Sequence, residues 1–382
     1  MPILAILGRQ TELSIAELES VFGAANISPV NQNICGLLNI DSVAAFDQLG
    51  GVQKAATTIA ELKSSDWRQI IREVAKHIDG LTSSIEGKIN LGLSVYGLPL
   101  TIGALNAGGL ELKKQLKKNG RSVRVVPNKT LDLNAAQVLY NKLIGPSGVE
   151  LIISKNKGGV LLAKTVWVQN IEAYAARDQA RPKRDAKVGM LPPKLAQTIL
   201  NLSGFDESKT VLDPFCGTGV VLQEALMMGG RAIGSDIEAR MVDYTKSNLE
   251  RLKQGNFSLQ VGDATTCKWK EDFDCVACET YLGRPLSSLP DRQTLEKIVQ
   301  DVNTIHKKFL TNLSRQTPAG LRLCLAVPAW KIPKGFLHLP ILDRLTDLGY
   351  NRVSFVHTPT TKLIYHRENQ LVARELVVLE RI

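Results

Sequence analysis

The sequence predicts an α/β protein in which a mostly parallel β-sheet fills the C-terminal half and two smaller α+β units precede it. Three observations carry this prediction. A turn containing two glycines joins a buried strand to a helix at residues 213–219, the strands that follow end in acidic residues, and a length of 382 residues suits two or three domains. Strands that alternate with helices in this way are typical of parallel sheets.

The first unit is predicted to cover residues 1–58. It opens with an apolar run that indicates a strand, followed by apolar side chains at helical spacing, with Ser14 as a candidate N-cap. A second, shorter helix ends before Gly50 and Gly51. The expected strands and helices occupy, in chain order, residues 1–8, 12–22, 35–40 and 43–48.

A second α+β unit is predicted for residues 59–168. Alternating side chains indicate a first strand, a helix with leucines at helical spacing ends at Gly120, and two further strands close the unit. Residues three and four apart share a helix face, so the cations in and after this helix form one basic stripe. The strands are expected at 89–96, 150–154 and 160–168, and the basic stripe consists of Lys113, Lys114, Lys117, Lys118, Arg121 and Arg124.

The basic stripe suits either of two roles. It can neutralise the phosphates of a nucleic acid, or it can be an ordinary solvated face. The net charge of +10 is uneven, because residues 1–184 hold 22 Lys and Arg against 15 Asp and Glu, whereas residues 185–382 hold 25 against 22. The basic excess lies mostly in the first half, as expected if this half binds an anionic polymer.

Residues 169–187 are predicted to form a structured basic connector. The segment is dense in arginine and contains one proline, so it is expected to be a poor helix overall, and it lacks the glycine and serine of a flexible linker. Arginine recognises phosphate through two parallel hydrogen bonds. We therefore expect phosphate contacts from Arg177, Arg181 and Arg184.

The C-terminal domain is predicted to cover residues 188–382, with its first helix entered near Pro193. A strand, a tight turn with Gly217 and Gly219, and a helix N-terminus together form a pocket that suits a nucleotide. Glycine lets the backbone approach a ligand closely. The turn lacks the third glycine of the dinucleotide fingerprint, so this pattern alone is a weak signal.

Acidic residues at the ends of the next strands strengthen the prediction. The second strand ends in Asp236, at a distance from the turn that suits a carboxylate holding ribose hydroxyls. The third strand ends around Asp263, and the fourth precedes Glu279. These acids are therefore expected to line one crevice at the sheet's edge. The three strands are expected at 231–236, 259–264 and 273–278, and an antiparallel hairpin of 352–357 and 374–380 is expected to complete the sheet.

Several classes of protein are disfavoured. The six cysteines are scattered and do not form a disulfide framework. Cys275 and Cys278 have the spacing of half a metal site, but residues three apart in a strand face opposite sides, so no metal is expected. The apolar start is too short for a signal peptide and no apolar run reaches membrane-spanning length, so we expect a cytoplasmic protein without a membrane partner. A monomer is assumed, since no pattern specifies an oligomer.

The order of these strand ends resembles that of class I S-adenosylmethionine-dependent methyltransferases, which have a Rossmann-like fold. In that fold the glycine turn abuts the methionine part of the cofactor, the second acid takes the ribose and the third takes the adenine amine. The resemblance implies that S-adenosyl-L-methionine is bound by Asp213, Pro214, Phe215, Gly217, Thr218, Gly219, Asp236, Ile237, Asp263 and Ala264.

The whole chain resembles the THUMP-domain tRNA guanosine N2-methyltransferases, which methylate the exocyclic amine of a tRNA guanine. The most specific matches are residues 181–197 and 213–219, and residues 6–19, 49–54 and 234–237 also fit. The resemblance implies that the first unit is ferredoxin-like and that the second is a THUMP-like domain binding the tRNA acceptor stem. It also implies RNA binding by the basic stripe and by the three connector arginines.

The catalytic motif of that family, Asp or Asn followed by Pro-Pro-Tyr and Gly, is altered here. Anchored on Gly283, Glu279 takes the position of the acid, both prolines are absent, and Tyr281 is shifted by one position. An exocyclic amine is a poor nucleophile because its lone pair is delocalised, and a carboxylate that accepts its N–H groups makes it more reactive. The resemblance implies that Glu279 activates the amine and that Tyr281 stacks on the flipped base.

The main functional prediction is therefore transfer of a methyl group from S-adenosylmethionine to the N2 amine of a guanosine in tRNA. Two alternatives remain open. The altered motif favours a catalytically impaired RNA-binding protein that retains the methyltransferase fold. A DNA amino-methyltransferase would have the same kinds of cofactor and catalytic motif, although the basic THUMP-like unit favours RNA.

Overall fold

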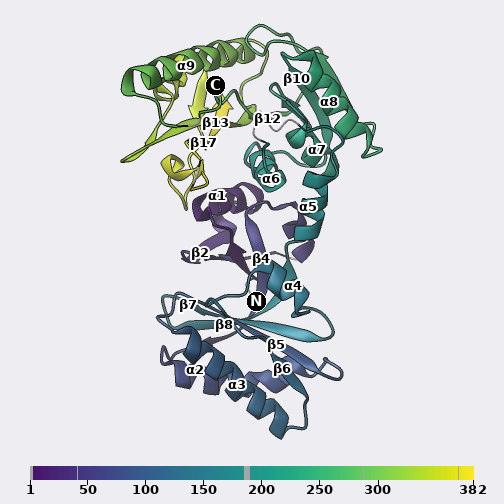
Figure 1. The fold of residues 1–382 in the computed structure, drawn as a ribbon, viewed down its shortest axis with the longest axis vertical. Helices are drawn as coiled ribbons and strands as arrows, with labels where there is room; N and C mark the ends of the chain where they lie inside the picture. Colours follow the sequence, from purple (N-terminus) through teal and green to yellow (C-terminus); the bar gives the residue numbers. More distant parts are fainter. Residues whose placement is uncertain (1–2, 41, 185–189, 287, 369) are drawn as a thin grey trace. The chain divides into compact units, whose positions relative to one another are not determined.

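The protein folds into two compact units, and each unit is built from segments that are not consecutive in the chain (Figure 1). The computed structural model describes residues 3–40, 42–184, 190–286, 288–368 and 370–382. The first unit contains residues 1–11, 25–47 and 52–172, and the second contains residues 12–24, 48–51 and 173–382. The end of the predicted connector, at 185–187, and the predicted start of the C-terminal domain at 188 lie outside the described residues.

The first unit is built on one eight-stranded sheet with the order β2-β3-β1-β4-β8-β7-β5-β6. Strand β4 (Val52–Leu62) pairs antiparallel with β1 and with β8, so the sheet continues across the boundary that the sequence predicts after residue 58. The structure thus joins the two predicted N-terminal units. The other strands are β1 (Ile3–Leu7), β2 (Ile27–Asn31), β3 (Ile34–Leu37), β5 (Ile89–Tyr96), β6 (Val123–Val125), β7 (Gly148–Lys155) and β8 (Val160–Val168).

Helices α2 (Trp67–Thr82) and α3 (Ile102–Lys118) pack their apolar faces on this sheet. The side chain of Thr101 accepts a hydrogen bond from the first turn of α3, as expected of an N-cap. A Cβ atom at Gly108 would lie 2.8 Å from the ring of Trp67, so glycine lets α3 approach α2 closely. A third helix, α4, covers Ala135–Tyr140, and the helix expected at 43–48 is a 3₁₀ helix.

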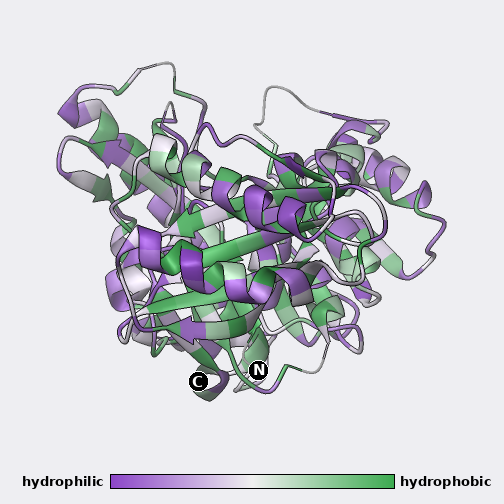
Figure 2. Ribbon diagram, turned by 90° about the horizontal axis from the view of Figure 1, so that it is seen from below, coloured by the Kyte–Doolittle hydropathy of each residue, from purple (hydrophilic) through white to green (hydrophobic). Residues whose placement is uncertain are grey.

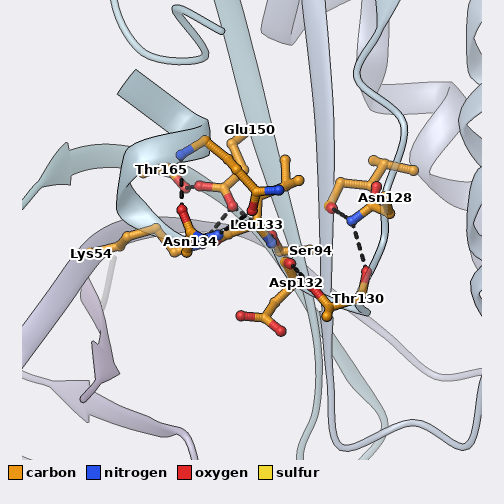
Figure 3. A network of polar contacts seen from close by, with 11 residues as sticks. Lys54, Ser94, Asn128, Thr130, Asp132, Leu133, Asn134, Glu150 and Thr165 are labelled. Carbon is orange, nitrogen blue, oxygen red and sulfur yellow. Dashed lines mark hydrogen bonds and ion pairs between the residues drawn. The ribbon is translucent and has the colours of Figure 1, made fainter. Parts of the chain in front are cut away.

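A buried polar network links the strands of the first unit (Figure 3). Lys54 on β4 donates to Glu150 on β7 at 2.6 Å and to the carbonyl of Leu133 at 2.7 Å. The Glu150 carboxylate also accepts hydrogen bonds from Ser94 and Thr165, at 2.5 and 2.6 Å. The Lys54 and Glu150 side chains are 1% and 0% exposed. The ion pair therefore ties the sheet to the loop that precedes α4.

The second unit contains a sheet with the order β11-β10-β9-β12-β13-β17-β15, to which β14 and β16 add as short ribbons. Strands β9 to β13 run parallel, and β17 and β15 run antiparallel at the C-terminal edge, which confirms the predicted mostly parallel fold. The strands are β9 (Thr210–Asp213), β10 (Arg231–Asp236), β11 (Phe257–Val261), β12 (Cys275–Glu279), β13 (Arg322–Ile332), β14 (Gly335–Leu337), β15 (Tyr350–Arg352), β16 (Ile364–Tyr365) and β17 (Val372–Arg381). The strand order changes direction between β9 and β12, the kind of position where open α/β sheets bind ligands.

Alternate side chains of these strands build two cores. Helices α6 (Pro193–Leu202), α7 (Val220–Met227) and α8 (Ala239–Glu250) contribute to the core on one face, and α9 (Arg292–Ser314) covers the other. In Figure 2, hydrophobic residues gather on the strands, and hydrophilic residues are frequent on the helices and loops. Pro193 stands in the first turn of α6, as predicted.

Cys275 and Cys278 belong to opposite cores, in agreement with their predicted positions on a strand. Among the residues that the structure describes, no three His, Cys, Asp or Glu side chains are grouped to hold a metal ion. No helix in the described part of the chain is both long and apolar enough to span a membrane.

Helix α1 (Thr11–Phe22) belongs to the second unit, although the sequence places it in an N-terminal one. Leu13 and Ala16 join the core around α6 and α7. Ser14 lies inside α1 rather than at its N-cap, and its hydroxyl donates to the carbonyl of Gly51 at 2.8 Å. Helical periodicity therefore predicted α1 but not the unit in which it packs.

The reason is a buried acid on α1. Glu17 is 0% exposed, and its carboxylate accepts hydrogen bonds from the backbone N–H groups of Gly50 and Gly51 at 2.9 and 2.7 Å. It also accepts one from the amide of Asn201 on α6, at 2.8 Å. A Cβ atom at Gly50 would lie 1.9 Å from the carbonyl oxygen of Lys194, so only glycine fits there. These contacts hold α1 and residues 48–51 against α6.

The connector differs from its prediction as a poor helix. Residues Ile171–Gln179 form helix α5, and Pro182 lies beyond its end, where it cannot interrupt the hydrogen bonds of the helix. The residues that follow the helix pack on the second unit, since Lys183 exchanges two hydrogen bonds with Asn248 on α8 at 3.0 Å each.

The predicted strand at 352–357 is shorter than expected. Strand β15 covers Tyr350–Arg352, and after it the N–H of Val353 makes one more hydrogen bond to the carbonyl of Val378 on β17, at 2.9 Å. The backbone N–H groups of Val356 and His357 donate to the carboxylate of Glu19 on α1, at 2.6 and 3.0 Å. Side-chain partners from a distant part of the sequence thus replace strand pairing here.

Candidate active site

The glycine turn lies between β9 and α7, as its sequence indicates. Gly217 and Gly219 have φ angles of +50° and +81°, which L side chains rarely adopt. A Cβ atom at Gly219 would lie 2.8 Å from Thr245 on α8, whereas one at Gly217 would meet only the carbonyl oxygen of Phe215, at 4.0 Å. The turn is therefore packed on α8 at Gly219 and open at Gly217, as a cradle for a ligand requires.

Two acids flank the turn. Asp213 at the end of β9 is 2% exposed and accepts a hydrogen bond from the N–H of Phe215 at 3.1 Å. Asp236 at the end of β10 accepts from the N–H groups of Gly217 and Glu238, at 2.9 and 3.0 Å. Burial raises the pKa of both carboxyl groups, and the nearby Asp236 raises that of Asp213 further. Asp236 therefore shapes the turn in addition to its predicted role toward ribose.

The other predicted cofactor residues lie along the same edge. Pro214 is buried, and Phe215 packs edge-on against Phe309 of α9, with 5.0 Å between ring centroids. Ile237 is 67% exposed and offers an apolar surface directly after Asp236.

Asp263 and Ala264 follow β11, whose end at Val261 comes earlier than the predicted end of this strand. The N–H of Gly262 donates to the carbonyl of Asp236 at 2.9 Å, which places Asp263 beside the end of β10. The Asp263 carboxylate accepts from the N–H of Thr265 at 2.8 Å. The structure thus brings the third acid to the edge that the sequence predicts.

Two residues of α8 that the sequence did not single out hold the turn in place. The hydroxyl of Thr245 donates to the carbonyl of Gly217 at 2.7 Å, and the amide of Asn248 donates to that of Thr218 at 2.9 Å. Both side chains are 0% exposed. Their sequence signal is weak, since it consists of two polar residues three positions apart, followed by the apolar Leu249.

Two of the three connector arginines have side-chain partners within the second unit. Arg177 on α5 forms an ion pair with Glu224 of α7 at 2.8 Å, and the Glu224 side chain is 0% exposed. Arg181 is 4% exposed, and its guanidinium lies 3.5 Å from the hydroxyl of Thr218. Arg181 is therefore buried, whereas the Arg177 side chain is 18% exposed, and the phosphate contacts expected of both remain a prediction. Arg184 is exposed and keeps its predicted role.

Glu279, the predicted catalytic acid, ends β12 at the same edge. Its side chain is 17% exposed and forms an ion pair with Arg374 on β17, whose Nε donates to Glu279 Oε1. Burial raises the pKa of the Glu279 carboxyl, while Arg374 opposes that rise. Sequence reasoning missed Arg374, because nothing in the chain order shows which strand β17 will lie near.

Thr280, directly after Glu279, is held by His306 on α9. Thr280 is 3% exposed, and its hydroxyl lies 2.7 Å from Nε2 of His306 on α9. His306 Nδ1 lies 2.8 Å from the carbonyl of Val302, which can only accept a hydrogen bond. Burial lowers the pKa of His306 to about 4, so the neutral ring donates from Nδ1 and accepts the Thr280 hydroxyl at Nε2. This contact fixes the chain just after Glu279.

Tyr281 follows at once and is 40% exposed. This exposure leaves the ring available for contact with a ligand. The stacking role remains a prediction.

The basic stripe lies on α3 and β6 of the first unit. Leu112 and Leu116 are buried against the sheet, while Lys114, Lys117 and Lys118 are exposed and Lys113 is partly exposed. Arg121 donates to the carbonyls of Thr82 and Ile85 after α2, and Arg124 donates to the side chain of Asn141 at 3.1 Å. The four lysines therefore keep their charges toward solvent, whereas the two arginines also have structural partners.

The sequence model of a family described as an RMKL-like methyltransferase domain matches residues 181–339 of this chain. A second model, described as a DNA methylase, matches residues 112–247. The first match covers the glycine turn, the strand ends and Glu279, so the second unit contains a methyltransferase domain.

Curated relatives are similar over part of the chain. A tRNA (guanine(10)-N2)-dimethyltransferase of Methanothermobacter thermautotrophicus is 33% identical over 153 residues, which is 40% of this chain and 43% of that protein. One of Pyrococcus abyssi is 29% identical over 201 residues, or 50% of this chain and 60% of that protein. The matches therefore span about half the length of these relatives.

Solved structures share the fold. TrmN from Thermus thermophilus aligns with 100% of this chain and 99% of its own, with a TM-score of 0.59 and 16% sequence identity. SMU.472, solved in complex with SAH, covers 99% of this chain and 97% of its own, with a TM-score of 0.55 and 10% identity. At this level of identity the likeness shows the fold of the whole chain.

Proposed function

We propose that this protein transfers a methyl group from S-adenosylmethionine to the N2 amine of a guanosine in tRNA. The observation that carries the proposal is the arrangement of the second unit's sheet edge. The turn at 213–219, Asp236 and Glu279 lie at the carboxyl ends of three strands that are neighbours in one parallel sheet. Curated relatives named as tRNA guanine-N2 methylating enzymes support the choice of substrate.

The residues of the turn fit the proposed cofactor. The open side of Gly217 admits a ligand against the backbone, and the Asp236 carboxylate can accept hydrogen bonds from ribose hydroxyls. The exposed face of Ile237 offers an apolar contact next to it. S-adenosylmethionine, when bound there, supplies an electrophilic methyl group.

In this proposal, Glu279 activates the guanine amine for attack on the methyl group. Its carboxylate accepts an N–H of the guanine amine, which directs the nitrogen lone pair toward the methyl group and stabilises the positive charge that develops on nitrogen. The same carboxylate can take up the proton released as the N–methyl bond forms. Tyr281 stacks on the extruded base and excludes water from the reacting atoms.

Asp236→Ala is expected to weaken the binding of S-adenosylmethionine at least about tenfold, because it removes a charge-assisted hydrogen bond that contributes roughly 1.5–3 kcal/mol. Titration calorimetry with the full chain measures this directly. Asp243→Ala, at an exposed acid on α8, is the matched control and should leave the affinity unchanged. Equal affinities for Asp236→Ala and the wild type would contradict the assigned cofactor site.

Substituting the exposed lysines of α3 should weaken tRNA binding. The quadruple variant Lys113→Gln, Lys114→Gln, Lys117→Gln and Lys118→Gln removes four charges from one helix face. Each lysine–phosphate interaction that the variant removes should reduce the slope of log affinity against log salt by roughly one. The control variant Lys307→Gln and Lys308→Gln, on exposed positions of α9, should have little effect. Unchanged tRNA affinity in the quadruple variant would refute the role of the basic stripe.

These charge variants must be made in the full chain. A fragment that ends near residue 184 would separate α1 from the core that it shares with α6, and would remove Asn201 from Glu17. Loss of binding in such a fragment would therefore report unfolding as well as RNA recognition.

DNA is the second candidate substrate, and the match of residues 112–247 to a DNA methylase model favours it. Incubation with radiolabelled S-adenosylmethionine and equal amounts of tRNA or double-stranded DNA separates the two. The proposal expects the label in tRNA. Label in DNA alone would replace the proposed substrate while keeping the enzyme class, and a folded, cofactor-binding wild type that labels neither would favour the impaired RNA-binding protein.

A further inference from the structure

We propose that Arg374 is a positioning residue for methyl transfer, which clamps one oxygen of Glu279 and leaves the other to accept the substrate amine. This inference rests on the proposed function. Arg374 lies on β17, far in sequence from the glycine turn and from residues 279–283, and its Nε donates to Glu279 Oε1. Its part in the reaction would be exerted through Glu279.

The geometry of the sheet makes the clamp possible. Glu279 is opposite Ala326 on β13, and Arg374 is opposite Pro328 on the other side of the same strand. Neighbouring strands are about 4.8 Å apart, so the two side chains reach across β13 from strands roughly 10 Å apart. The short side chains of Ala326 and Pro328 leave room for this contact. Arg374 is 5% exposed, so its guanidinium meets Glu279 inside the protein.

The clamp also compensates charge. The negative charges of Glu279 and of Asp236 on β10 both raise the pKa of Asp213 on β9, in addition to the larger effect of its burial. Burial raises the pKa of the Glu279 carboxyl, and Arg374 opposes this rise. On the other side of Arg374, Tyr365 of β16 is its partner in the sheet. A nearby guanidinium favours the ionised carboxylate, which is the form that can accept an N–H from the amine. Loss of Arg374 should therefore impair Glu279 most at low pH.

A glutamate needs such a clamp more than an aspartate does. Its side chain has one more rotatable bond, and burying it in one conformation costs more conformational entropy. A guanidinium that donates in a fixed direction removes this freedom. Thr280 and His306 fix the backbone just after Glu279, and Arg374 fixes the carboxylate itself.

The test is the dependence of turnover on pH for methyl transfer to tRNA at saturating cofactor. In Arg374→Gln the acid limb of the profile should move up by about one to three pH units, because an adjacent cation lowers a carboxyl pKa by this amount. Arg374→Lys retains the charge but not the guanidinium geometry, so its acid limb should stay near the wild type while turnover falls roughly tenfold to a hundredfold. Arg352→Gln is the matched control. Arg352 on β15 pairs at 2.5 Å with Glu375, the neighbour of Arg374 on β17, and the acid limb of this variant should not move.

A double variant separates positioning from folding. Removing Arg374 alone leaves a buried carboxylate unpaired, whereas the double variant Glu279→Gln and Arg374→Gln has no such charge. Its turnover should equal that of Glu279→Gln alone, since Arg374 acts only through Glu279. A further drop of tenfold or more would overturn the inference, and so would an Arg374→Gln enzyme with the wild-type acid limb. A wild type that transfers no methyl group would overturn the proposed function and this inference together, whereas an active wild type with an unshifted variant overturns only the inference.

Discussion

Glu279→Gln is expected to lower the turnover of methyl transfer by about 10²–10³, the usual cost of losing a preorganised electrostatic contact to the reacting group. The amide keeps the shape of the side chain but cannot offset the charge that develops on the amine nitrogen. Cofactor affinity should change little, because Glu279 ends β12 whereas the turn and Asp236 belong to β9 and β10. Single-turnover rates and calorimetry on the same preparation measure the two quantities.

Tyr281→Ala provides the comparison. It should weaken binding of the RNA by roughly 1–3 kcal/mol through the loss of one base–aromatic stack, with a smaller effect on the chemical step once RNA is saturating. If Glu279→Gln and the wild type turn over equally, Glu279 is not the acid of the motif. The backbone carbonyl of Thr280 would then be the next candidate.

Lys54→Met is expected to destabilise the first unit by about 3–5 kcal/mol, because it leaves the Glu150 charge uncompensated in the interior. The substituted side chain also loses its hydrogen bond to the Leu133 carbonyl, so the loop before α4 should loosen. Urea unfolding gives the change in free energy. Hydrogen exchange of peptides from β4 and β7 shows whether the loss is confined to the first unit.

Two further variants identify the cause. Adding Glu150→Gln to Lys54→Met removes the unpaired charge and should recover most of the lost stability. Lys76→Met breaks an exposed pair with Glu73, whose side chains are 67% and 41% exposed, and should cost no more than about 1 kcal/mol. A Lys54→Met protein as stable as Lys76→Met would show that the buried pair contributes little.

Much of the second unit could be predicted from sequence because its signals are local. The strand, the two glycines and the helix are consecutive in the chain, and Asp236 follows at the spacing that a parallel sheet imposes. The strands β5 and β8 were also predicted with their observed bounds, because the residues of each strand are consecutive in the chain.

The features that sequence reasoning missed depend on contacts between distant segments. The packing of α1 in the second unit follows from Glu17, a charged residue whose burial nothing in the sequence indicates and that two glycine N–H groups and Asn201 hold in the interior. The arginines of the connector illustrate the same limit. Arg177 and Arg181 belong to an arginine-rich segment that suits phosphate binding. Only the fold shows that Arg177 pairs with Glu224 and that Arg181 lies beside the hydroxyl of Thr218.

The departure at 279–283 is explained in the same terms. The sequence shows which prolines are missing, but not which contacts hold the motif. The His306 ring fixes Thr280, and Arg374 holds Glu279, although both residues lie outside the motif. Residues 279–283 are therefore held by contacts from outside the motif, which favours an active methyltransferase over the catalytically impaired RNA-binding protein.

The most direct test of the proposed function is mass spectrometry of nucleosides from tRNA that has been incubated with the purified full chain and S-adenosylmethionine carrying a deuterated methyl group. We expect labelled N2-methylguanosine or N2,N2-dimethylguanosine, formed by the wild type and reduced by about 10²–10³ in Glu279→Gln. Label in another nucleoside, or no label from a folded wild type that binds the cofactor, would contradict the proposed function.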